Sequence, residues 1–371
     1  MIRKIYIDLL LRKFSDKEYG RLFSLGRQYL LTHLSSLLRR PFCGPILGTL
    51  VTNYRCNYRC VMCGLPQRDM EFNDRGLREF DTARMLRVID EFASLGVSGI
   101  GFTGGEPLLR KDVFELLAHA KRRGMISHLN TNGALLDDTA ARNIVSAGVD
   151  SLNVSLDGAH AKTHDAIRGV EGAFEKAVRA VERAIAARKR SGAGLRIKTV
   201  AVLGEDNIDE AVEIVGLSQD LGADCVEFIP QQPFAVGKQN VPAAPTFQGK
   251  VETIAGTLIR MKRSGARIEN SLAHLRLFSR SFSGEPSPLK CFAGYNSLAV
   301  DCYGEIYPCV PWYNWRRPAG NVQETDLEGF WYSKRYNRLR KEVSGCRGCY
   351  LNCQAELNIL FSPLSIRDTA A

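Results

Sequence analysis

Residues 46–63 of the chain read ILGTLVTNYRCNYRCVMC. The first part, Ile46 to Thr52, is apolar and β-branched and predicts a buried strand. Directly after this strand, Cys56, Cys60 and Cys63 stand with three and then two residues between them. Thiolates at this spacing can converge from one loop onto an iron–sulfur cluster. The alternatives are a zinc site that lacks its fourth ligand, or buried free thiols.

The chain from residue 46 to about 230 alternates short apolar segments with helical patterns, which is typical of repeated βα units and a parallel sheet. The expected strands are Ile46–Thr52, Val97–Phe102, Ser127–Thr131, Ser151–Ser155, Arg196–Leu203 and Cys225–Ile229. The expected helices are Thr82–Ser94, Val113–Arg122, Asp138–Ser146, Ala173–Lys189 and Ile208–Leu221. Six such units predict an α/β fold, a partial (β/α)6 TIM-like barrel whose site lies at the carboxyl ends of the strands.

Polar turns follow three of these strands. They read Gly104-Gly-Glu-Pro107, Asn130-Thr-Asn-Gly133 and Ser155-Leu-Asp-Gly158. The carboxyl ends of parallel strands meet on one side of a barrel, so we expect these turns to converge beside the three cysteines. Any one of them alone is compatible with an ordinary βα turn.

The CxxxCxxC signature, the Gly-Gly-Glu turn and the Ser-x-Asp turn together resemble the radical S-adenosylmethionine (SAM) superfamily over residues 46–230. The resemblance implies a [4Fe–4S] cluster on Cys56, Cys60 and Cys63, with one iron open to SAM. It also implies SAM contacts from other residues, namely Gly104, Gly105, Glu106, Thr131, Asn132, Ser155, Asp157 and Arg168. A surface salt bridge is the alternative role for Arg168. The sequence departs from the family at Met62, where an aromatic residue often packs on adenine.

Six of the eleven cysteines lie in the last quarter of the chain. Four of them form two pairs, Cys291 with Cys309 and Cys346 with Cys349. Together these four thiolates could bind either zinc or an iron–sulfur cluster. This pattern resembles the SPASM/twitch auxiliary-cluster domain, and the shorter twitch form fits better. The resemblance implies an auxiliary [4Fe–4S] cluster. Cys302 and Cys353 are then left as spare ligands, buried thiols or hydrogen-atom donors, with the buried thiol the simplest role for Cys302.

These patterns divide the chain into four parts. We expect a helical amino-terminal extension (1–45), a core barrel (46–265), a linker (266–288) and a small cysteine-rich auxiliary domain (289–371). The extension is amphipathic over Tyr19 to Leu38, which suits a cap on the barrel or, with Arg39 and Arg40, a membrane-surface or partner-binding helix. Cys43 and Cys225 are expected as a linker thiol and a strand thiol.

Composition restricts the remaining classes of protein. The chain has 45% hydrophobic and 24% charged residues, which is ordinary for a folded globular protein. A formal charge of +10 suits anionic ligands, but no nucleic-acid motif accompanies it. There is no secretory signal and no long apolar segment, so we expect a cytoplasmic protein without a transmembrane span.

The resemblance implies reductive cleavage of SAM, hydrogen abstraction from a biosynthetic substrate, and oxidation, bond formation or epimerisation. The substrate is a small molecule or a peptide, and a flavodoxin or ferredoxin is the implied reductant. A peptide-modifying maturase and a non-catalytic metal-binding or regulatory protein are the alternative functions. The short front segment argues against a typical leader-binding module, and the sequence does not identify the substrate.

Overall fold

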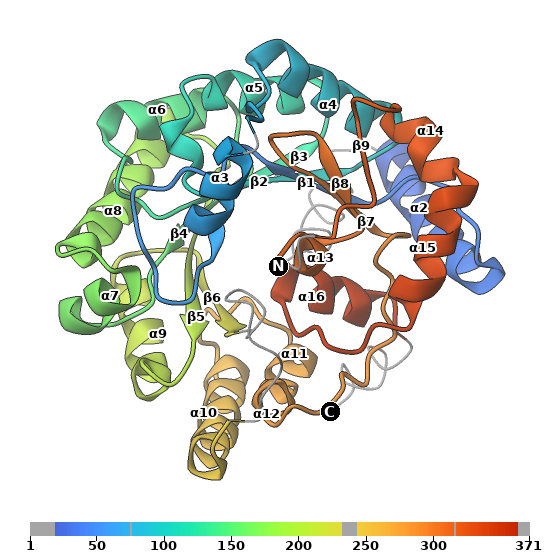
Figure 1. The fold of residues 1–371 in the computed structure, drawn as a ribbon. Helices are drawn as coiled ribbons and strands as arrows, with labels where there is room; N and C mark the ends of the chain where they lie inside the picture. The colour runs from blue at the N-terminus through green and yellow to red at the C-terminus, as the bar shows by residue number, and fades with distance from the viewer. Residues whose placement is uncertain (1–18, 75, 232–242, 315–316, 363–371) are drawn as a thin grey trace.

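The computed structural model describes residues 19–74, 76–231, 243–314 and 317–362. Six parallel strands form one curved sheet with helices on its outer side (Figure 1). They are β1 (Leu47–Val51), β2 (Gly99–Thr103), β3 (Ile126–Thr131), β4 (Ser151–Ser155), β5 (Arg196–Leu203) and β6 (Cys225–Pro230). Each pairs in parallel with the next. The predicted partial barrel is therefore confirmed.

Five of the six outer helices begin and end close to their predicted bounds, and the sixth, α7, was not predicted. They are α4 (Thr82–Ser94), α5 (Val113–Arg122), α6 (Asp138–Ser146), α7 (Ala161–Arg168), α8 (Ala173–Ser191) and α9 (Ala211–Asp220). Asp81 and Asp137 cap α4 and α6 by accepting hydrogen bonds from the main chain of the first turn. Short 3₁₀ turns span Pro107–Leu109 and Ile208–Glu210.

Alternate residues of each strand face the helices or the inside of the barrel. On β5, Thr199 faces outward and donates a hydrogen bond to Ser218 of α9, so its neighbours Lys198 and Val200 face inward. Lys198 is fully buried, whereas Val200 and Val202 on the same face keep accessible surface. The inside of the barrel is therefore accessible towards the carboxyl ends of the strands and filled below them.

The cysteine-rich part of the chain extends the barrel sheet. Strand β7 (Ser297–Val300) pairs in parallel with β1, and β8 (Glu305–Tyr307) and β9 (Gly320–Asn321) follow it in antiparallel order. The sheet thus has nine strands in the order β6-β5-β4-β3-β2-β1-β7-β8-β9. The sequence did not predict that the terminal unit shares one sheet with the barrel.

The other helices are α2 (Tyr19–Leu38), α3 (Leu65–Asp74), α10 (Pro245–Arg263), α11 (Leu272–Arg276), α12 (Phe278–Phe282), α13 (Val310–Asn314), α14 (Leu327–Tyr332), α15 (Lys334–Ser344) and α16 (Asn352–Leu360). The expected linker, 266–288, thus carries α11 and α12. Next to α11, Glu269 and Asn270 bond to the main chain of β6 and cover its edge. The expected crossover after Gln231 lies largely outside the described residues.

Helix α16 closes the open side of the barrel between β6 and β7 (Figure 1). Asn352 donates hydrogen bonds to the Glu227 carboxylate and to the Phe228 carbonyl of β6. Two residues on, Gln354 accepts a hydrogen bond from Ser297 of β7. The helix therefore joins the two edges of the barrel through buried polar side chains.

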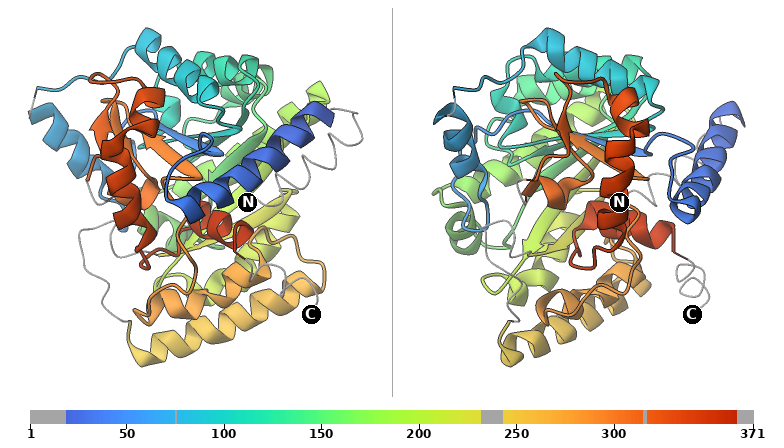
Figure 2. Two further views of the ribbon diagram at one scale, coloured as in Figure 1. Left: turned by 90° about the vertical axis from the view of Figure 1, so that its right-hand side faces the viewer. Right: turned by 45° about the vertical axis from the view of Figure 1, so that its right-hand side comes forward.

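Helix α2 packs against the amino ends of β1 and β2 at the edge of the molecule (Figure 2). The Gln28 amide donates to the carbonyls of Gly44, Pro45 and Gly96. Among the described residues, no helix combines the length and the apolar character that crossing a membrane requires.

Candidate active site

The Gly-Gly-Glu turn packs directly on the start of the cysteine loop. The Gly105 amide donates to the Asn53 carbonyl at 2.9 Å, and the Glu106 amide donates to the Arg55 carbonyl at 2.8 Å. A Cβ atom on Gly105 would lie 2.0 Å from the Arg55 oxygen, and one on Gly104, whose φ is +139°, would lie 2.2 Å from the Asn53 oxygen. Only glycine permits this approach, so both glycines position the cysteine loop against β2.

The Glu106 carboxylate is committed to the protein. It is fully buried and accepts hydrogen bonds from the Leu108 amide, the Thr131 hydroxyl and the Asn132 amide at 2.8–3.0 Å. Burial raises the pKa of Glu106, and these donors offset part of that effect. Glu106 therefore fixes the turn after β3, while its contact with SAM stays a prediction.

Cys56, Cys60 and Cys63 follow the carboxyl end of β1 on one loop, and each residue keeps some accessible surface. Burial, with the neighbouring Cys60 and Cys56 thiols, raises the pKa of Cys63 to about 11. Metal binding deprotonates such thiols at neutral pH. Cys56 accepts contacts from the Tyr58 amide at 3.4 Å and from the Asn132 side-chain amide at 3.8 Å.

Arg168 lies in the site and is buried, so the surface salt bridge considered from the sequence is wrong. Its Nη2 pairs with Asp157 Oδ2 at 2.5 Å, and its Nη1 lies 3.8 Å from Cys60 Sγ. Burial alone would lower the pKa of Arg168, but Asp157 and Cys60 keep it above the ordinary value. The guanidinium therefore links the turn after β4 to a thiol of the cysteine loop.

Asp157 and His164 hold the turn after β4. The Asp157 carboxylate accepts a hydrogen bond from the Val202 amide at 2.7 Å, and its main-chain amide donates to His164 Nδ1 at 3.0 Å. Burial lowers the pKa of His164 to about 4, and nearby Arg168 adds to the effect, so the ring is neutral. Ser155 ends β4 and keeps accessible surface on the inner side.

The residues around the cysteine loop fit a bound polar cofactor. Four buried polar atoms here lack a hydrogen-bond partner among the described residues: Asn53 Oδ1, Tyr58 Oη, His164 Nε2 and Arg168 Nε. Buried polar groups in folded proteins are normally paired. Unpaired donors and acceptors beside three thiols are what a cluster with SAM would satisfy.

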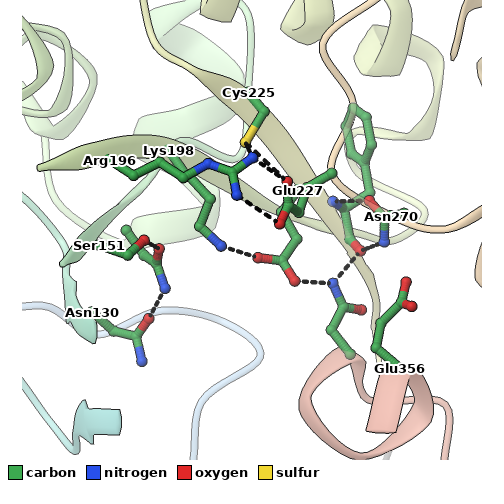
Figure 3. Close-up of polar contacts among 12 residues, drawn as sticks. Asn130, Ser151, Arg196, Lys198, Cys225, Glu227, Asn270 and Glu356 are labelled. Carbon is green, nitrogen blue, oxygen red and sulfur yellow. Dashed lines mark hydrogen bonds and ion pairs between the residues drawn. The ribbon is translucent and has the colours of Figure 1, made fainter. Parts of the chain in front are cut away.

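The inside of the barrel holds a second polar network that the sequence analysis missed (Figure 3). Lys198 reaches from β5 to Glu227 on β6, with 2.9 Å between Nζ and Oε2 and almost no exposure of either side chain. Burial alone would raise the pKa of Glu227, but Lys198 and the Asn352 amide lower it to about 2. Beside this pair, Asn153 donates to Asn130 at 2.7 Å. The alternation of side chains along a strand could have predicted that these side chains share the inner face of the barrel. It could not have predicted which of them pair.

A deep histidine borders the same network. Burial, with Lys198 nearby, lowers the pKa of His128 to about 4. His128 keeps some accessible surface. Gly101 makes room for it, because a Cβ atom there would lie 2.4 Å from His128 Nε2.

The terminal cysteines gather into one group. Burial raises the pKa of Cys291 to about 11, and the Cys346 thiol contributes. Burial also raises the pKa of Cys309, as do the neighbouring thiols. These neighbours are Cys291, Cys349 and Cys353. Each of the four predicted auxiliary ligands thus has another of them nearby, and Cys353, which the pattern left over, lies near Cys309.

The remaining thiols have separate surroundings. Cys302 is fully buried in the main core, as expected of a structural thiol. Cys225 begins β6 and contacts Glu269, and Cys43 contacts Thr32 of α2. Within the described ranges, no three His, Cys, Asp or Glu side chains are gathered closely enough to hold a single metal ion as they stand.

Two family models match the chain. The model of the radical SAM superfamily covers residues 50–217, and that of an iron–sulfur cluster-binding domain, SPASM, covers residues 291–350. The first implies a SAM-binding [4Fe–4S] cluster, and the second implies auxiliary iron–sulfur clusters.

Curated relatives match most of the chain. An AdoMet-dependent heme synthase of Methanosarcina barkeri is 27% identical over 79% of this chain and 84% of its own length. A PqqA peptide cyclase of Methylocella silvestris is 29% identical over 80% of this chain and 77% of its own.

Solved structures share the fold. Streptococcus suis SuiB bound to S-adenosylmethionine has a TM-score of 0.60 and 16% identity over 80% of this chain and 66% of its own. Native anSMEcpe with bound AdoMet has a TM-score of 0.58 and 18% identity over 80% of this chain and 83% of its own. The chain thus belongs to the radical SAM superfamily, whose members are enzymes, and carries a SPASM-type iron–sulfur domain at its carboxyl end.

Proposed function

We propose that this chain cleaves SAM reductively and uses the resulting 5′-deoxyadenosyl radical to take a hydrogen atom from a biosynthetic substrate. The observation that carries the proposal is the position of the loop with Cys56, Cys60 and Cys63 after β1, next to buried polar atoms that have no hydrogen-bond partner among the described residues. A site that only stored a cluster would need no such polar surroundings.

The chain's own residues would bind and orient the cofactors. Cys56, Cys60 and Cys63 would hold three irons, and the donors Asn132 and Arg168 would stabilise the negative charge on the thiolates. The two glycines before Glu106 would keep the loop against β2. The low-dielectric surroundings would exclude water from the reacting groups.

The auxiliary group would determine the outcome of the reaction. Cys291, Cys309, Cys346 and Cys349 would hold the second cluster, which would accept the electron left on the substrate and give net oxidation or bond formation. Cys353 keeps some accessible surface and lies near Cys349 and Cys309. If it returned a hydrogen atom instead, the outcome would be epimerisation. We place the core at 46–265 and the auxiliary unit at 289–371.

The substrate would lie inside the barrel, above Lys198 and Glu227. Asn130 and Ser155 keep accessible surface there, so this part of the barrel suits a polar substrate. The heme synthase relative supports a small-molecule substrate such as a tetrapyrrole, and the PqqA peptide cyclase relative supports a peptide. Incubation with iron-coproporphyrin III and with precursor peptides, followed by mass spectrometry, would separate these two classes.

Anaerobic reconstitution tests the proposal. The reduced protein with SAM should form 5′-deoxyadenosine and methionine, and a Cys60→Ala variant should form neither. Cys43→Ala, which removes a thiol outside both groups, is the matched control and should retain the activity. Absence of 5′-deoxyadenosine from the wild type would favour a non-catalytic metal-binding protein.

Metal content tests the auxiliary site separately. Two clusters predict roughly eight iron atoms per chain, and Cys291→Ser with Cys346→Ser should lower this to about four. About four iron atoms with one zinc in the wild type would contradict the auxiliary cluster. Reduction by flavodoxin or ferredoxin in place of dithionite would test the proposed electron donor.

A further inference from the structure

Helix α2 is amphipathic, but it buries polar side chains and exposes apolar ones, which is the reverse of an ordinary surface helix. The face that packs on the protein carries polar side chains, among them Gln28, Thr32 and Ser35, all buried. The face that points away from the protein is apolar. Its side chains are between 39% and 76% exposed, and they are Phe23, Leu30, Leu34, Leu37 and Leu38.

These five residues lie along one side of the helix, with Gly26 and Arg27 between Phe23 and Leu30, and we call them the α2 stripe. Successive spacings of seven, four and three residues, followed by the adjacent Leu38, place them on one side of a helix. Five of the eleven large hydrophobic residues that are exposed in the described chain belong to it. Single exposed leucines are common on proteins, but a row of them marks an interaction site.

The stripe is not left over from poor packing, because the opposite face of α2 is firmly attached. Gln28 is held by three carbonyl groups, and its oxygen accepts a hydrogen bond from the Ser98 hydroxyl at 2.9 Å. The Tyr29 ring stacks on Phe361 with 4.8 Å between centroids. Rotating the helix to bury the leucines would break these contacts, so the orientation is fixed.

The charges around the stripe indicate its partner. Arg27, Arg39 and Arg40 are exposed beside it, and residues 19–45 contain no aspartate or glutamate. Residues 1–45 carry nine basic and three acidic residues, which accounts for six of the net +10 charges of the chain. A second copy of this helix would bring arginines against arginines, which is unfavourable.

We propose that the α2 stripe lies in the surface of an anionic lipid bilayer, with its leucines and Phe23 below the headgroups and the arginines against lipid phosphates. An apolar face flanked by basic residues binds membranes in this way without crossing them. Helix α2 contacts Gly44 and Gly96, which precede β1 and β2, so docking would leave the carboxyl ends of the strands free. The inference does not rest on the proposed reaction.

Co-sedimentation of the full-length, reconstituted protein with vesicles tests the proposal. One set of vesicles contains phosphatidylcholine alone, and the other contains phosphatidylcholine and phosphatidylglycerol at about three to one. We expect binding to the anionic vesicles that weakens as salt is added. A Leu30→Gln/Leu34→Gln/Leu37→Gln variant should lose roughly tenfold or more of this binding.

The control variant changes exposed apolar residues elsewhere. Leu135→Gln/Val212→Gln, at positions 39% and 38% exposed, should bind vesicles like the wild type. Circular dichroism and thermal midpoints should show that all variants are folded, since every altered residue is at least 38% exposed. Failure of the full chain to bind anionic vesicles would overturn the proposal. Unchanged vesicle binding by the triple variant would also overturn the proposal. So would light scattering that shows the wild type as a dimer and the triple variant as a monomer, because the stripe would then be a dimer interface.

Discussion

Replacement of Lys198 by methionine should destabilise the protein through the carboxylate that it leaves behind. Lys198 and Glu227 are buried and 2.9 Å apart, and Asn352 is the other partner of that carboxylate. Methionine keeps most of the volume but removes the positive charge. Removing one member of a buried ion pair costs about 3–5 kcal/mol. We expect a loss of that size in the free energy of unfolding, measured by urea titration at pH 7.

The pH dependence of this loss gives a second readout. In the wild type the pKa of Glu227 is about 2, below its ordinary 4.5, so the pair's contribution is complete above pH 4.5 and is lost as the pH falls towards 2. In Lys198→Met, burial acts without the lysine and raises that pKa above 4.5. The carboxyl then takes up a proton on acidification, so the deficit relative to the wild type should shrink from pH 7 to pH 5.

A double-mutant cycle provides the control. Lys198→Met/Glu227→Gln replaces the pair by neutral side chains of similar shape and should recover most of the stability, since buried pairs contribute little net energy. The sum of the two single losses should therefore exceed the loss in the double variant. A Lys198→Met loss below about 1 kcal/mol, with losses additive within about 0.5 kcal/mol, would refute the pairing of β5 and β6 through these side chains.

Three further substitutions test other parts of the site. Gly105→Ala should lower the free energy of unfolding by about 1–3 kcal/mol in urea titration and impair SAM cleavage, because the new Cβ would meet the neighbouring loop. Gly216→Ala is the control and should have neither effect, because a Cβ atom there has nothing within 4 Å. Equal stability and activity of the two variants would contradict the close approach of Gly105 to the loop. Arg168→Met should cost about 3–5 kcal/mol by leaving its carboxylate partner unpaired, and an unchanged thermal midpoint would count against the buried pair. Burial lowers the pKa of His128 to about 4 from 6.5, so the wild type should lose stability as the pH falls from 6.5 to 4. His128→Gln should make the free energy of unfolding depend less on pH in this interval. An unchanged dependence on pH would disprove the burial effect.

Local patterns predicted the barrel well. The alternation of short apolar segments with helical patterns predicted the six strands, and the structure adds that Asp81 and Asp137 cap α4 and α6. The cysteine spacing and the polar turns likewise predicted which residues meet after β1 to β4. Each of these signals is local, or depends only on parallel strands ending on the same side.

Contacts between distant segments could not be predicted in the same way. Asn352 meets Glu227 across 125 residues, and no spacing rule links them. Strand β7 has only four residues, which is too short to show a period, so its pairing with β1 was missed. In α2 the apolar spacing was visible, but the polar partners at Gly44 and Gly96 turn that face outward.

The pairing of β7 with β1 has a practical consequence for experiments that shorten the chain. The domain boundary suggested by the sequence lies at residue 289, before β7, so a cut there would remove the neighbour of β1. In the full chain β1 lies inside the sheet, between β2 and β7. After the cut its unpaired main-chain groups would form an exposed sheet edge, which can pair with strands of other molecules. We expect the isolated barrel to aggregate, whereas a chain that retains β7 to β9 with substituted auxiliary cysteines keeps the edge covered.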